Sequence, residues 1–279
     1  MTVNRPLVSI VTPSLNQAKF MRATLESVAM QDYPAIEHIV VDGGSNDGTV
    51  DILRSWSGHP IRWVSEKDRG QADAIAKGFA LSTGTVLAWL NSDDTYLRPD
   101  AVSRLVEPFA QGARVVTAGG SYIDDLGAHI GFIPVSSRIN HDSLRCLDTV
   151  LQPATFFDRA LVDQFPIDTS LHYVFDWDLF IRMSATATFR SLDLAIAGYR
   201  LHGAGKTETG GYLRQRELLH IAVRYRGQRN LATLLLAGIV ATYWAASWFP
   251  VGLQRRHDLL VHKVAAWSNR LTNGHGIAY

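Results

Sequence analysis

Two adjacent carboxylates, Asp93 and Asp94, follow a short uncharged run, Val86–Leu90, that has the length of a buried strand. Arg98–Asp100 then predicts the start of a helix, so the pair is expected on a loop at the carboxyl end of that strand. Open α/β sheets bind ligands at this end. Neighbouring aspartates repel each other unless a positive group is held there, and their hard oxygens suit Mg²⁺ or Mn²⁺ carrying phosphates. The tetrad from Asn91 to Asp94 is equally typical of an ordinary turn.

Polar loops also follow two earlier strand-like runs. Residues 12–16 read Thr-Pro-Ser-Leu-Asn, and residues 42–49 read Asp-Gly-Gly-Ser-Asn-Asp-Gly-Thr. The second loop is not a dinucleotide fingerprint, because its glycines follow the second strand and are accompanied by two aspartates. Asp42, directly at the strand end, could accept hydrogen bonds from a base or a ribose. Asp47 or Thr49 could equally cap the next helix, with the glycines supplying positive φ.

A third acidic loop, residues 66–74, leads into the helix before the Asn91 strand. Carboxylates at such a position can simply stabilise a helix N-terminus. Spacing alone does not decide between this role and ligand binding.

Strand-like and helix-like segments alternate through the first half of the chain. The predicted strands are residues 7–12, 36–41, 61–65, 86–90 and 115–119, and the predicted helices are residues 20–30, 50–56, 71–81 and 99–109. Residues 122–130 are typical of a hairpin with glycine at its turn. This alternation predicts an α/β fold with a mainly parallel sheet and helices on both faces.

Composition narrows the class of protein. The chain has 279 residues, of which 47% are hydrophobic and 19% charged, so it can bury a sizeable core. The net charge of +1, without a basic stripe, gives no reason to expect a nucleic-acid partner. The single Cys146 excludes an internal disulfide. The apolar run Leu7–Val11 is too short for a signal peptide, so we expect a cytoplasmic protein.

Four segments in order resemble the signatures of the family 2 inverting glycosyltransferases of GT-A fold: residues 8–16, 41–49, 68–74 and 89–94. The likeness continues to roughly residue 205. The predicted catalytic region is residues 1–211, with a nucleotide-sugar half at about residues 1–120 and an acceptor half at about residues 121–211. It implies a Rossmann-like GT-A sheet, a nucleotide-diphospho-sugar donor, most commonly a UDP-sugar, and a divalent Mg or Mn cation. It also implies an acceptor that is a glycan, such as a polysaccharide of the cell envelope, or a lipid-linked oligosaccharide.

The resemblance assigns roles to residues in the first half. Five of them would bind the donor nucleotide: Pro13, Ser14, Asn16, Asp42 and Asp68. Asp42 would contact the base, and Asp68 would help to hold the nucleoside. Asp94 would bind the metal, and Asp93 would contact the metal or the ribose. The tetrad begins with Asn91, where many relatives have aspartate.

Asp176 and Asp178 lie where Tyr173–Arg182 predicts the opening of a helix. Two positions apart on a helix, they cannot face the same way, so one is expected toward a cleft while the other caps the helix or pairs with Arg182. An inverting transfer needs a carboxylate that takes the proton of the acceptor hydroxyl. In the family this base is the Asp of a Glu-Asp pair. Here the pair reads Phe175-Asp176, so the resemblance gives the role to Asp176 without its glutamate.

The segment Tyr199–His202 ends the likeness. The corresponding family segment has a histidine near the metal and diphosphate, which makes His202 a candidate metal ligand, although a lone histidine is more often a packed or surface residue. Lys206 is close enough in sequence to assist at the diphosphate. The glycines from Gly203 to Gly211 suggest a lid over the donor.

The composition changes in the C-terminal region, residues 212–279. Residues 213–226 predict a basic helix, and residues 231–253 contain no charged residue over about the 20 positions that a bilayer span requires. Arginines flank both ends, which argues against a clean crossing. Trp244 and Trp248 are typical of an interfacial helix. The family resemblance implies acceptors at the inner face of the plasma membrane, where such a helix would bind. A buried helical hairpin explains the same pattern.

Two other functional classes remain open. A sugar nucleotidyltransferase would share the sheet and a metal-binding aspartate, but it normally needs a Gly-rich basic loop after its first strand, where this chain has Pro13–Asn16. A non-catalytic nucleotide-sugar-binding module fits the missing glutamate before Asp176. The sequence does not identify the sugar, the acceptor or the linkage.

Overall fold

The computed structural model describes residues 5–203, 205–228 and 230–246. They fall into two compact units, the first ending at His202 and the second beginning at Gly203. The sequence places the change to a helical region somewhat later, at residue 212. Each unit is described below by itself.

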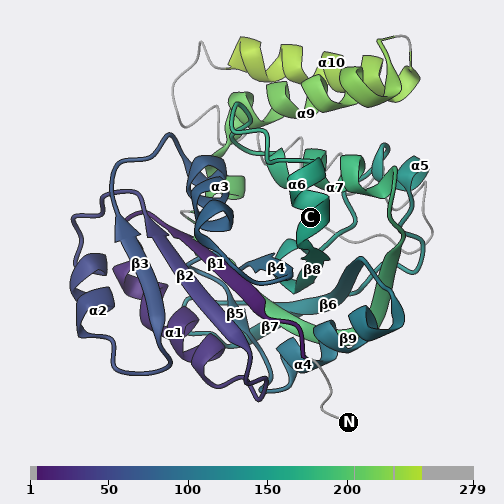
Figure 1. The fold of residues 1–279 in the computed structure, drawn as a ribbon. Coiled ribbons are helices and arrows are strands. Elements are labelled where there is room, and N and C mark those ends of the chain that lie inside the picture. The colour runs from purple at the N-terminus through teal and green to yellow at the C-terminus, as the bar shows by residue number, and fades with distance from the viewer. Residues whose placement is uncertain (1–4, 204, 229, 247–279) are drawn as a thin grey trace. The chain divides into compact units, whose positions relative to one another are not determined.

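Within the described part of the first unit, nine strands form one sheet (Figure 1). They are β1 (Val8–Ser14), β2 (Ile36–Asp42), β3 (Ile61–Ser65), β4 (Val86–Trp89), β5 (Thr95–Tyr96), β6 (Val115–Ile123), β7 (His129–Ile133), β8 (Thr155–Asp158) and β9 (Phe189–Arg200). The helices of this unit are α1 (Ala18–Ala29), α2 (Thr49–Ser55), α3 (Gln71–Leu81), α4 (Ala101–Val106), α5 (His141–Leu144), α6 (Arg159–Gln164) and α7 (Phe175–Ser184), with short 3₁₀ turns η1 (Glu107–Gln111) and η2 (Gln152–Ala154).

The sheet has a parallel half and a mixed half. Its order is β3-β2-β1-β4-β8-β6-β9-β5, and β7 pairs with β6. The strands β3, β2, β1 and β4 are parallel to one another, whereas β8 is antiparallel to both of its neighbours. The predicted α/β class is confirmed, and the predicted strands and helices up to β6 occur in the predicted order, with the unpredicted β5 between β4 and α4. The β6–β7 hairpin turns at Gly127 with a φ of 86°. The parallel arrangement is thus concentrated in the half that carries the acidic loops.

Helices cover both faces of the parallel half. On one face, Met21 and Leu25 of α1 and Leu53 of α2 pack with Val40 of β2. On the other face, α3 approaches β1 closely at Gly78. A Cβ atom at Gly78 would lie 2.3 Å from the side chain of a β1 valine, so glycine is required for this distance.

The loop of residues 91–94, here called the aspartate loop, follows β4. An aromatic cluster packs around Trp89 at the end of this strand. Its ring is stacked on Phe180 of α7 at 6.1 Å and meets Phe157 of β8 edge-on at 5.8 Å. Phe79 of α3 meets both Trp89 and Phe157 edge-on. Since Trp89 is 1% exposed, this cluster fixes the strand end from which the aspartate loop departs.

The second unit is helical and contains α8 (Lys206–Thr209), α9 (Gly211–Arg226) and α10 (Leu231–Ala246). The α10 helix packs against α9. It buries Val240 and Tyr243 and exposes Leu234, Leu235 and Trp244. Among the described helices, none combines the length and the apolar character that a bilayer crossing requires. Residues 247–253 of the predicted apolar segment lie outside the described residues.

Candidate functional site

The carboxyl ends of the parallel strands meet at one edge of the sheet. In the strand register Ser14 of β1 lies opposite Asp42 of β2, and Asp42 lies opposite Ser65 of β3. The fourth parallel strand ends at Trp89, just before Asn91. The polar loops that the sequence singled out therefore leave the same end of the sheet, where open α/β folds bind ligands.

The Asp42 carboxylate is fully buried and is bound by its own loop and by the end of β3. It accepts hydrogen bonds from the Gly44 N–H at 3.1 Å and the Ser45 N–H at 2.9 Å. The hydroxyls of Ser45 and Ser65 donate to it at 2.5 and 2.7 Å. These four donors use most of the acceptor capacity of a carboxylate. Asp42 therefore shapes its loop, and its contact with a nucleotide base stays a prediction.

Asp68 joins the third acidic loop to the second. A Cβ atom at Gly43 would lie 2.6 Å from the Asp68 Oδ2 atom, closer than side chains tolerate. The other oxygen, Oδ1, accepts a hydrogen bond from the Gly70 N–H at 2.8 Å. Asp73 is instead bound by Arg69, whose hydrogen bonds lower the pKa of Asp73. Asp73 anchors the start of α3, and Asp68 lies beside the glycine loop.

Asn16 ties the first loop to the second, with a left-handed φ of 53°. Its N–H donates to the Ser45 hydroxyl at 2.7 Å, and its Oδ1 accepts from the Asn46 N–H at 3.0 Å. The nearby Pro13 and Ser14 are buried at the end of β1, and the Ser14 hydroxyl has no hydrogen-bond partner among the described residues. Since a buried hydroxyl without a partner costs free energy, a bound ligand would satisfy it.

Asp47 caps two helices. Its carboxylate accepts hydrogen bonds from the Ala18 N–H at 2.9 Å and from the Thr49 N–H and hydroxyl at 3.0 and 2.6 Å. Partial burial acts to raise the pKa of Asp47, but these hydrogen bonds bring it below its ordinary value. Because Ala18 begins α1 and Thr49 begins α2, Asp47 has the capping role that the sequence left open.

Asp94 is 2% exposed, and each of its carboxylate oxygens has a donor. Oδ1 accepts from the Arg200 N–H at 3.0 Å, and Oδ2 accepts from the Asn91 amide at 3.2 Å. Burial and the adjacent Asp93 charge raise the pKa of Asp94 well above its ordinary value, which the two hydrogen bonds only partly oppose. A nearby cation would favour the ionised form of this carboxylate.

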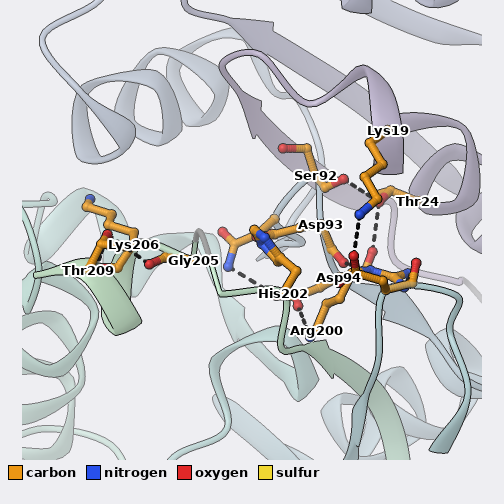
Figure 2. Close-up of polar contacts among 12 residues, drawn as sticks. Lys19, Thr24, Ser92, Asp93, Asp94, Arg200, His202, Gly205, Lys206 and Thr209 are labelled. Carbon is orange, nitrogen blue, oxygen red and sulfur yellow. Dashed lines mark hydrogen bonds and ion pairs between the residues drawn. The ribbon is translucent and has the colours of Figure 1, made fainter. Parts of the chain in front are cut away.

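Asp93 meets His202 and Arg200 in Figure 2. The Asp93 Oδ2 atom lies 3.1 Å from the His202 Nε2 atom, and Arg200 Nε donates to the Asp93 carbonyl oxygen at 2.7 Å. The Phe20 ring packs against both side chains, 4.8 Å from the His202 ring and 4.9 Å from the Arg200 guanidinium. The end of β9 thus brings two sequence-predicted candidates, Asp93 and His202, into contact.

The oxygen and nitrogen atoms of the aspartate loop and of His202 suit a divalent cation that arrives bound to a ligand. Asp93 and Asp94 supply hard carboxylate oxygens, and His202 supplies an imidazole nitrogen. Within the part of the chain that the structure describes, no cluster of three or more acidic, His or Cys side chains is arranged to hold a metal. Mg²⁺ commonly takes only one or two protein carboxylates and completes its shell with phosphates and water. The residues present therefore fit a metal–nucleotide complex better than a closed metal cage.

Asp176 and Asp178 lie in the first turn of α7 and have different surroundings. Asp178 is fully buried and forms an ion pair with Arg182 at 2.7 Å, so the predicted pairing is confirmed. Asp176 is half-buried, and its Oδ1 accepts a hydrogen bond from the Trp177 N–H at 2.8 Å. Asp178 is bound into the protein interior, and Asp176 is the more accessible of the two acids.

The start of α7 lies near the ligand end of the sheet. The Phe175 ring lies 6.3 Å from the Trp89 ring, which is two residues before Asn91. On the segment before α7, the His172 Nδ1 atom lies 3.2 Å from the position that a Cβ would take at Gly70. Phe175 occupies the position of the expected glutamate and joins the buried aromatic cluster.

Lys206 lies in the second unit, at the start of α8. Its predicted assistance at the diphosphate stays a prediction.

Three side chains that the sequence did not single out hold the aspartate loop. The Thr24 hydroxyl of α1 lies 2.9 Å from the Ser92 carbonyl oxygen and 2.8 Å from that of Asp94 (Figure 2). The Gln152 amide of η2 and the Arg200 guanidinium of β9 also contact the loop. Thr24 lies in the helix predicted at residues 20–30, and Arg200 lies in the segment Tyr199–His202 that ends the family likeness.

Known proteins have sequences similar to much of this chain. The family model described as Glycosyl transferase family 2 matches residues 9–158, more than half of the chain. An uncharacterised glycosyltransferase of Mycobacterium tuberculosis is 36% identical over 161 residues, which cover 56% of this chain and 60% of that protein. A PGL/p-HBAD biosynthesis glycosyltransferase of Mycobacterium bovis is 28% identical over 204 residues, covering 71% of this chain and 78% of that protein.

Two solved structures have a similar fold. The mannosyltransferase PcManGT from Pyrobaculum calidifontis, in complex with GDP-Man and Mn²⁺, matches with a TM-score of 0.64 and 18% identity over 98% of this chain and 82% of that chain. Staphylococcus aureus TarS 1–349, in complex with UDP-GlcNAc, matches with a TM-score of 0.58 and 16% identity, over 85% of this chain and 71% of that chain. These likenesses show the GT-A fold, and the match of the family model shows that the chain belongs to glycosyl transferase family 2.

Proposed function

We propose that the protein is an inverting glycosyltransferase that moves a sugar from a nucleotide-diphospho-sugar to a hydroxyl of a glycan or a lipid-linked acceptor. The observation that carries this proposal is the common location of the acidic loops and the start of α7 at one end of the sheet, in a member of this family. The similar TarS structure contains UDP-GlcNAc, which supports a UDP-sugar as the donor. The relative named for PGL/p-HBAD biosynthesis supports an acceptor that belongs to the cell envelope.

The nucleotide would bind over the loops that end β1, β2 and β3. The Ser14 hydroxyl would donate to or accept from the nucleotide, because it is buried without a protein partner among the described residues. Asp68 would hold the nucleoside beside Gly43, where the absence of a Cβ leaves room for the carboxylate. Asp42 would fix the loop through its four internal hydrogen bonds and present its remaining acceptor capacity to the base.

Asp93, Asp94 and His202 would hold a Mg or Mn cation together with the donor diphosphate. When bound, such a cation supplies positive charge that stabilises the developing charge on the departing diphosphate. Arg200 would keep the two aspartates in place, since its N–H binds the Asp94 carboxylate and its side chain binds the Asp93 carbonyl oxygen. Lys206 would add a further positive group at the diphosphate.

Asp176 would act as the general base. Its carboxylate would take the proton of the acceptor hydroxyl while that oxygen forms a bond to the anomeric carbon. The oxygen would attack on the face opposite the diphosphate, and the bond from this carbon to the diphosphate oxygen would break with its electron pair leaving on the nucleoside diphosphate, so the configuration inverts. The Asp178–Arg182 ion pair would hold the first turn of α7 in place.

The replacement of the expected glutamate by Phe175 favours one alternative, a module that binds the nucleotide sugar without catalysis. A donor screen by thermal shift with Mn²⁺, followed by measurement of nucleoside diphosphate release, separates the two functions. Binding at a hundredfold excess over the dissociation constant stabilises a protein by about 2.7 kcal/mol. A stabilising donor that is also cleaved supports the enzyme, and stabilisation without cleavage or transfer supports the binding module.

A further inference from the structure

Three side-chain amides form a continuous chain beside Asp94. The Gln71 Nε2 atom donates to the Asn91 Oδ1 atom at 2.7 Å. The Asn91 Nδ2 atom donates to Asp94 Oδ2 at 3.2 Å and to Gln152 Oε1 at 3.3 Å. The Gln152 Nε2 atom donates to the Trp89 carbonyl oxygen at 2.6 Å. This row of amides connects α3, the end of β4 and η2.

The Trp89 carbonyl sets the direction of every hydrogen bond in this row of three amides. A carbonyl oxygen only accepts, so the Gln152 amide must turn its NH₂ group toward Trp89 and its oxygen toward Asn91. Asn91 must then present its NH₂ group to Gln152, and the second hydrogen of that group reaches Asp94. The Asn91 oxygen is left to face Gln71, which donates to it. A reversal of any one amide would bring two like groups together, so the orientation of Asn91 is fixed.

We infer that Asn91 is a positioning residue for Asp94, and that its position requires an amide rather than a carboxylate. An aspartate at 91 has the same size and would still accept from Gln71. Its second oxygen, however, would face Asp94 Oδ2 and Gln152 Oε1 at the distances of the present hydrogen bonds, where all three atoms are acceptors. Repulsion would then turn Asp94 away from its present orientation.

The row of amides also links the loop of Asp68, which would bind the nucleoside, to Asp94, which would bind the cation. This role rests on the proposed function. Gln71 is the first residue of α3 and directly follows the loop in which Asp68 binds the Gly70 N–H. A shift of this loop would be transmitted through Gln71 to Asn91 and Asp94. Nucleotide held at the Asp68 loop and a cation held at Asp94 are therefore expected to reinforce each other.

Binding of Mn²⁺ to the full chain tests this inference without an activity assay. Free Mn²⁺ is measured by electron paramagnetic resonance in the presence of UDP or GDP, for the wild type and for the Asn91→Asp and Asn91→Ala variants. Loss of a group that orients a metal ligand typically weakens metal affinity about 10- to 100-fold, which is the expected result for both variants. Metal-free binding of the nucleotide should change less than about twofold, because the nucleoside contacts lie elsewhere.

Gln31→Glu is the matched control. Gln31 is also a partly buried amide that bonds three groups, Ser27, Arg98 and Val102, none of which belongs to the aspartate pair. The Gln31→Glu substitution should lower the melting temperature and leave the Mn²⁺ affinity unchanged. Unchanged or tighter Mn²⁺ binding by both folded Asn91 variants would overturn the inference. A wild type that binds neither nucleotide with Mn²⁺ would instead overturn the proposed function, on which the inference rests.

Discussion

Asp94 is a buried carboxylate with a second carboxylate beside it, an arrangement that gains free energy when a cation is held there. Substitution Asp94→Ala should therefore abolish the effect of Mn²⁺ on donor binding. The fold should persist, because the loop adds little to the apolar core. Isothermal titration of the nucleotide with and without Mn²⁺ measures the effect.

Asp42→Ala is the comparison for this titration. It should weaken nucleotide binding to the same extent with and without Mn²⁺, because Asp42 organises the loop expected to hold the nucleoside. An Asp94→Ala variant whose binding still responds to Mn²⁺ as in the wild type would end the assignment of Asp94.

Asp176 is expected to act in the transfer step and not in donor binding. Asp176→Asn preserves shape and removes the basic oxygen, so turnover should fall about 10²- to 10⁴-fold while the donor dissociation constant stays the same. Steady-state kinetics and donor titration on the same preparation give both quantities.

Asp178→Asn should produce the opposite phenotype. It removes one charge of a buried ion pair and leaves Arg182 without its partner, which should lower the free energy of unfolding by about 3 kcal/mol. Urea denaturation measures this loss. An exchange of the two phenotypes would show that the wrong aspartate was chosen as the base.

The spacing of residues predicted local contacts but not distant ones. The Asp178–Arg182 pair follows from a separation of four on one helix and could be predicted. The contacts of Thr24 and Arg200 with the aspartate loop span 68 to 107 positions of sequence, and only the folded sheet brings them together. A carboxylate pair can therefore be recognised in a sequence, whereas the groups that orient it cannot.

At the scale of elements, the packing of the second and third loops depends on Gly43. In Gly43→Ala the new methyl group would displace the Asp68 carboxylate from its hydrogen bond with the Gly70 N–H. We expect nucleotide affinity to fall by roughly tenfold, or about 1.4 kcal/mol. Gly131→Ala in β7 is the control, because its methyl group would meet Tyr122 at an ordinary distance of 3.5 Å. Equal affinities of the two variants would show that Asp68 does not hold the nucleoside.

Elements with a regular pattern were predicted closely. The strand at residues 61–65 and the helix at residues 71–81 have the same bounds in the structure. The two-residue strand β5 was missed, because Thr95–Tyr96 is too short to show a pattern and exists only through pairing with β9. The antiparallel insertion of β8 was also missed, since it depends on which distant strands pair rather than on local periodicity.

At the scale of the whole molecule, we expect the second unit to bind a membrane surface, where the proposed lipid-linked acceptor would be held. The α10 helix carries no charge and exposes Leu234, Leu235 and Trp244, and α9 ends with Arg224 and Arg226. Apolar side chains with an aromatic residue and flanking arginines favour the surface of an anionic bilayer.

The full chain should therefore sediment with vesicles that contain anionic lipid and remain in solution with neutral vesicles at the same salt concentration. A chain truncated after Gly211 should lose this binding and retain donor binding. Aggregation of the truncated chain, together with a full chain that ignores vesicles, would mean that the helices serve internal packing only.

The release of nucleoside diphosphate from a panel of nucleotide sugars, measured with Mn²⁺ and with lipid-linked and glycan acceptors, tests glycosyl transfer most directly. The wild-type chain should release nucleoside diphosphate from one donor, faster with a suitable acceptor, and the product should have the inverted anomeric configuration by NMR. The Asp176→Asn variant should bind that donor and release nucleoside diphosphate about 10²- to 10⁴-fold more slowly. A wild type that binds a donor tightly and never cleaves it, or that transfers with retention of configuration, would contradict the proposed function.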